Sequence, residues 1–100
     1  MNVTRDKINF KYQEMINILK DELNGLMADY YTLNGKIMFH SAEIEFSELY
    51  YPNSAVGNLS RAEIEKLKTE QNAILDRMTD IEKEIKEKEL EKLCVVGIYT

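Results

Sequence analysis

Apolar residues from Tyr12 to Ile44 recur in a seven-residue rhythm. One heptad position holds Ile16, Leu23, Tyr30, Ile37 and Ile44, and the other holds Tyr12, Leu19, Leu26 and Leu33. His40 is the one interruption of this pattern. Two apolar positions in every heptad are typical of a long helix with a single stripe that packs on a partner helix. We therefore predict a first helix over residues 5–51.

The ends and the continuity of this helix follow from a few local signals. Thr4 can cap its first backbone amides. The pairs Asn24-Gly25 and Asn34-Gly35 would each suggest a turn in isolation. The heptad phase continues across both pairs, however, so we expect an unbroken helix. Pro52 ends it, because proline cannot donate a backbone hydrogen bond and disfavours helical geometry in the residue before it.

A second helix is predicted over residues 60–93, after a connector of residues 52–59. Its expected start is Arg61, because Ser60-Arg61-Ala62-Glu63 has the pattern of a capping box. The apolar stripe comprises Ile64, Leu67, Gln71, Ile74, Met78, Ile81 and Ile85. The heptad phase is lost at Lys88 and Lys92, which occupy positions where apolar residues would continue the stripe. Residues 94–100 are expected to form a short, extended apolar tail.

Together these elements predict one all-α domain over residues 1–100, a long antiparallel two-helix hairpin of the coiled-coil type. Folding about the connector gives the facing pairs Ile44–Leu67, Ile37–Ile74, Leu33–Met78, Tyr30–Ile81 and Leu26–Ile85. The same register places His40 opposite Gln71, which we interpret as a polar layer that sets the alignment. The alternative for His40 is a metal ligand or a general base. A metal site needs several convergent ligands, and the chain has one histidine.

A second apolar stripe lies on the first helix, opposite the hairpin seam. It comprises Tyr31, Gly35, Met38, Phe39, Ala42, Phe46 and Leu49. A single hairpin would leave this stripe in water, as an apolar patch of a size that soluble monomers usually avoid. We predict a homodimer that buries it in a four-helix bundle. Two alternatives are that the tail from Val95 to Tyr99 covers it, or that a different protein docks on it.

Composition and charge narrow the classes of partner. The net charge is −5 and the sequence pI is about 4.9, which disfavours nucleic acid and anionic membranes as primary partners. The N-terminal residues 1–6 lack the apolar core of a signal peptide, and no stretch is long and apolar enough to span a bilayer. The single cysteine, Cys94, excludes an internal disulfide and suits a reducing compartment. We expect a cytoplasmic protein.

Motifs for catalysis or cofactor binding are absent from the sequence. It has no glycine-rich phosphate loop, no zinc-like cluster of cysteine and histidine, and no Ser/His/Asp set. Carboxylates are abundant but interspersed with lysine, as on a solvated helix surface. We expect no enzymatic activity, no cofactor and no metal.

In length and two-helix plan the chain resembles the small secreted hairpin proteins of the WXG100 family and short phage-encoded regulatory proteins. The Trp-x-Gly bend of the WXG100 family is missing, since the chain has no tryptophan and bends at Tyr51-Pro52-Asn53. No residue role is carried over from either group. We expect a non-enzymatic interaction module, an adaptor or regulator that acts as a helical homo-oligomer. The alternative is an acidic inhibitor of the viral counter-defence type, which blocks the basic cleft of a nucleic-acid-handling enzyme.

Overall fold

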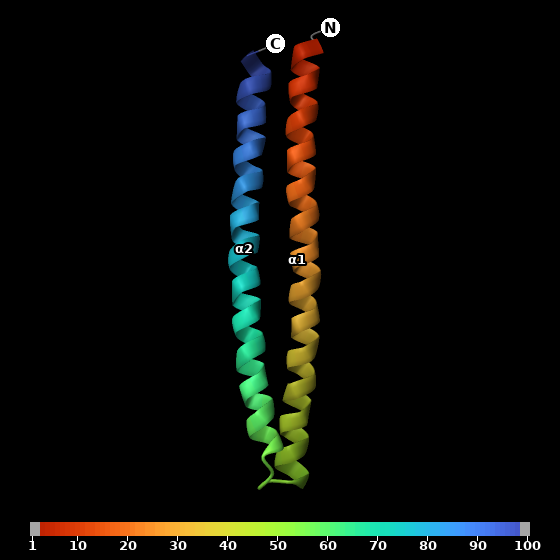
Figure 1. The fold of residues 1–100 in the computed structure, drawn as a ribbon, viewed down its shortest axis with the longest axis vertical. Coiled ribbons are helices and arrows are strands. Elements are labelled where there is room, and N and C mark those ends of the chain that lie inside the picture. Colours follow the sequence, from red (N-terminus) through yellow and green to blue (C-terminus); the bar gives the residue numbers. More distant parts are fainter. Residues whose placement is uncertain (1–2, 99–100) are drawn as a thin grey trace. The chain divides into compact units, whose positions relative to one another are not determined.

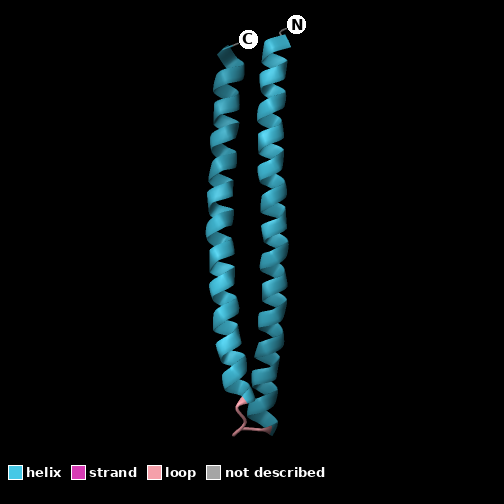
Figure 2. Ribbon diagram, in the orientation of Figure 1, coloured by secondary structure: helices cyan, strands magenta, loops and turns pink. Residues whose placement is uncertain are grey.

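Two long helices account for nearly all of the chain. The structure is a computed structural model that describes residues 3–98. Helix α1 spans Val3–Tyr50 and helix α2 spans Val56–Ile98 (Figure 1). Residues 51–55 connect them, and no strand is present between residues 3 and 98 (Figure 2). The prediction of an all-α two-helix hairpin is confirmed.

Contacts between the helices divide into two compact units. One consists of Met1–Leu26 with Arg77–Thr100, of which residues 3–26 and 77–98 are described. The other, Met27–Asp76, contains the connector. We call them the terminal unit and the hairpin unit.

The terminal unit is held by a small aliphatic core. Ile81 is fully buried and packs with Ile16 and Ile85. The partly buried Leu19, Leu23 and Leu26 pack against this cluster. At its edge, Arg77 donates from Nε and Nη2 to Glu22 Oε1, at 3.2 and 2.9 Å. This side-chain hydrogen bond and the charge of Glu22 raise the pKa of Arg77 above its ordinary value.

Helix α2 extends further than the sequence pattern suggests. Lys88 and Lys92 are half-buried in continuation of the seam, and Lys92 Nζ donates to Gln13 Oε1 at 3.0 Å. Lysine can occupy such positions because its aliphatic stem covers apolar surface while its ammonium group reaches a polar partner. The helix continues to Ile98, so the predicted extended tail is wrong for residues 94–98. Tyr99 and Thr100 lie outside the described residues.

The hairpin unit turns within a short connector. The Tyr51 carbonyl accepts from the Ser54 amide at 2.9 Å, across the Pro52–Asn53 turn. Ser54 Oγ then accepts from the Val56 amide at 3.2 Å, which is the hydrogen bond of a helix N-cap. Helix α2 therefore begins five residues before the predicted Arg61, and the predicted cap Ser60 is buried inside the helix.

Small residues explain why α2 can begin so early. A short connector requires the two helices to approach closely beside it. Ser47 of α1 faces Gly57, and Ser47, Gly57 and Ser60 are all buried. A Cβ added at Gly57 would lie 3.7 Å from Ser47 Oγ, which shows how near the chains pass. The capping-box pattern at Ser60 therefore does not mark the start of α2. Ser54 caps the helix instead, and close packing places Ser60 inside it.

The earlier start also changes the register. Gln71 is buried, and its Nε2 donates to Asn34 Oδ1 at 2.7 Å and to the Tyr30 carbonyl at 3.3 Å. Gln71 therefore faces residues of α1 that lie about one heptad closer to the N-terminus than His40, its predicted partner. Such a slip keeps the same residues in the seam. Every predicted seam residue of both helices is buried or half-buried, and both Asn-Gly pairs are helical.

Candidate protein interaction site

In the hairpin unit, exposed apolar side chains are most concentrated on one face of α1, which we call the outer face. We define the outer face by the seven predicted residues: Tyr31, Gly35, Met38, Phe39, Ala42, Phe46 and Leu49. All seven are exposed. The five large ones are exposed at 63% (Tyr31), 72% (Met38), 65% (Phe39), 55% (Phe46) and 76% (Leu49). Helical periodicity places them together, because they recur at intervals of three and four residues.

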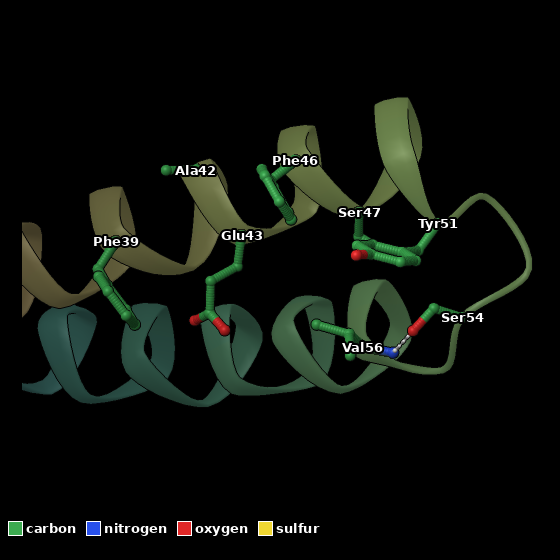
Figure 3. Close-up of a pocket in the computed structure, with 8 residues that line it drawn as sticks. All are labelled: Phe39, Ala42, Glu43, Phe46, Ser47, Tyr51, Ser54 and Val56. Carbon is green, nitrogen blue, oxygen red and sulfur yellow. Dashed lines mark hydrogen bonds between the residues drawn. The ribbon is translucent and has the colours of Figure 1, made fainter.

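An apolar groove borders this face near the connector (Figure 3). Its volume is about 480 Å³, and its lining combines Phe39, Ala42, Glu43, Phe46, Ser47 and Tyr51 with Ser54 and Val56. The Phe46 ring lies 4.8 Å from the Tyr50 ring and 6.0 Å from the Tyr51 ring, between ring centroids. These contacts hold Phe46 beside the groove while leaving it accessible.

Sequence reasoning missed the contribution of the connector region to this surface. Tyr50 and Tyr51 are 65% and 61% exposed and extend the aromatic surface. Val56 joins the groove because α2 begins at this residue rather than at Arg61. Ser54, a capping residue that precedes Ser60 by six positions, was the signal that could have revealed this.

The predicted polar layer has different partners from those expected. His40 Nδ1 lies 2.8 Å from Glu43 Oε1 on the same helix, and Gln71 is bonded to Asn34 and Tyr30. Both atoms of the His40–Glu43 contact are shielded from solvent, and neither has another hydrogen-bond partner among the described residues. No described hydrogen bond joins His40 to Gln71. Asn34, which the sequence pattern did not single out, takes the role assigned to His40.

The outer face presents apolar side chains, so the contacts that it can make with a partner are mainly apolar. Within residues 3–98, no group of three or more His, Cys, Asp or Glu side chains is placed to hold a metal ion. No helix in the same range is long and apolar enough to cross a membrane. The described part of the tail, Val95–Ile98, is helical.

Comparison with known proteins gives no family for the chain. No protein-family model matches it, and no significant match was found among curated proteins or solved structures.

Proposed function

We propose that this protein is a non-enzymatic interaction module that acts as a homodimer through the outer face of α1. The observation that carries the proposal is the exposure of five large apolar side chains on one face of one helix. Hydrophobic burial contributes about 25 cal/mol per Å² of apolar area, so association offers this face a substantial free-energy gain. In the dimer the four helices form a bundle with the two α1 helices at its centre.

The dimer would be the functional unit of an adaptor or regulator. Burial of the outer face leaves α2 and the charged flanks available to a second protein. A reducing, cytoplasmic setting suits the exposed thiol of Cys94, which would be prone to oxidation elsewhere.

Light scattering coupled to size-exclusion chromatography tests the dimer. The unmodified chain should elute with twice the mass of one chain, and Phe39→Glu with Phe46→Glu should give a monomer that keeps its helical circular dichroism. Ile18→Glu is the matched control, since Ile18 is 67% exposed on α1 but lies outside the outer face. An unmodified chain that stays monomeric at high concentration would refute the proposal, and a variant that still dimerises would place the interface elsewhere.

The net charge of −5 supports a second candidate function, an acidic inhibitor that occupies a basic cleft of a nucleic-acid-handling enzyme. Binding of this kind weakens as salt screens the charges. An affinity for a basic partner that is unchanged between low and high salt would exclude it.

A further inference from the structure

We infer that the second copy binds antiparallel, with the twofold axis passing between Met38 and Phe39 of the two outer faces. This inference rests on the proposed homodimer and specifies its geometry. In an antiparallel twofold pair, each residue on one side of the axis faces a residue equally far on the other side. The outer face can therefore be tested for complementarity with itself.

The axis at Met38 and Phe39 matches apolar residues throughout the face. Tyr31 of one copy meets Phe46 of the other, and Met38 meets Phe39. Sulfur–aromatic and aromatic–aromatic contacts of these kinds are favourable beyond simple area burial. No exposed large side chain of the face is left opposite a charge.

Small residues fall where two helices must approach most closely. Gly35 of one copy meets Ala42 of the other, on the line between the two rows of large side chains. Nothing lies within 4 Å of a Cβ built on Gly35, so the space above it is open to a partner. Further out, Leu49 meets Ala28, which is exposed in the same hairpin unit. Large side chains thus meet small ones at both ends of the contact.

Charge distinguishes this arrangement from a parallel one. The antiparallel register brings Lys36 of one copy within one helical turn of Glu43 of the other, and symmetry repeats the pair. In a parallel twofold pair, equivalent residues lie at the same height, so Lys36 of one copy and Glu43 of the other would stay about 10 Å apart along the axis. The antiparallel arrangement brings these opposite charges close together, and this attraction favours it.

The area available on the outer face falls in the lower part of the range of specific protein interfaces. If the exposed parts of the five large side chains were fully covered, at about 200 Å² for each whole side chain, at most roughly 660 Å² per copy would be buried. A standard protein interface buries about 800 Å² per partner.

Disulfide trapping tests the geometry. Ala28→Cys and Leu49→Cys are made separately in a Cys94→Ser background, mixed, and oxidised mildly. We expect the disulfide that joins the two different variants to dominate. Disulfides between identical variants should be rare, because the antiparallel pairing separates like positions by about 30 Å at 1.5 Å per residue, far beyond disulfide reach. Disulfides only between identical variants would overturn the antiparallel geometry, and an absence of any disulfide would overturn the register.

A matched pair of glycine variants gives a second readout. Gly35→Leu should raise the dimer dissociation constant at least about tenfold, a change of about 1.4 kcal/mol, because leucine blocks the close approach to Ala42. Gly25→Leu should leave that constant unchanged, since Gly25 is equally open but lies outside the outer face. Equal effects of the two variants would contradict the inference. A trapped or light-scattering dimer that shows the wrong disulfides leaves the proposed function standing, whereas a monomer in light scattering removes both.

Discussion

A glycine inside a helix makes the helix less stable than an alanine would, and α1 contains two glycines. Gly25 and Gly35 are both helical, and a Cβ at either would have no neighbour within 4 Å. Neither glycine is required by positive φ, since no described residue has one. The helix is kept through both positions by its seam, which packs on α2.

Replacing Gly25 by alanine should therefore stabilise the fold. Alanine loses less backbone freedom on folding than glycine, so the free energy of unfolding should rise by about 0.4–1 kcal/mol. Urea denaturation followed by circular dichroism measures this change. A loss of stability would show that the position is crowded, contrary to the open surroundings seen in the structure.

Gln71 is the buried polar residue on which the register of the hairpin unit depends. Its amide is shared between Asn34 Oδ1 and the Tyr30 carbonyl. Gln71→Ala should lower the free energy of unfolding by about 1–3 kcal/mol, because it leaves two half-buried acceptors without this donor. Asn72→Ala, an exposed amide on the next position of the same helix, should change it by less than about 0.5 kcal/mol. Equal effects would indicate that the Gln71 contacts do not hold the helices in register.

At the scale of the elements, periodicity and turn chemistry carried different information. The heptads predicted which residues of α1 and α2 are buried, because a stripe repeats along the whole helix. They could not fix which turn of one helix faces which turn of the other, since a slip of one heptad preserves the stripe. Register was decided by the connector, where Ser54 rather than Ser60 caps α2 and Gly57 fits against Ser47.

The two serines offer a direct test of this explanation. Ser54→Ala removes the acceptor of the Val56 amide and should cost about 1 kcal/mol of stability. Ser60→Ala should cost little or stabilise slightly, because Ser60 is a buried helix-interior position where alanine has the better propensity. Both variants are compared with the unmodified chain in urea. The opposite ranking would restore the capping box at Ser60 as the start of α2.

At the scale of the whole molecule, the sequence predicted the outer face but not its surroundings. The seven residues of that face are exposed as their spacing requires, since they lie opposite a seam that the heptads define. Tyr51 and Val56 join the groove through the connector, and no periodic pattern reaches across a bend. Which protein covers the outer face depends on the free energy of its association with that protein, which the sequence of one chain does not determine.

Thermal unfolding as a function of concentration measures that association without any label. If the folded state is a dimer, dissociation accompanies unfolding, so the midpoint temperature should rise with protein concentration. For two chains of this length, an unfolding enthalpy of about 0.7 kcal/mol per residue gives a rise in the midpoint temperature of roughly 3.5 °C per tenfold increase in concentration. Phe46→Glu should remove the dependence, because a carboxylate cannot be buried against Tyr31 of the other copy, whereas Ile18→Glu should keep it. A midpoint independent of concentration in the unmodified chain would mean that the outer face is left in water or reserved for a different protein.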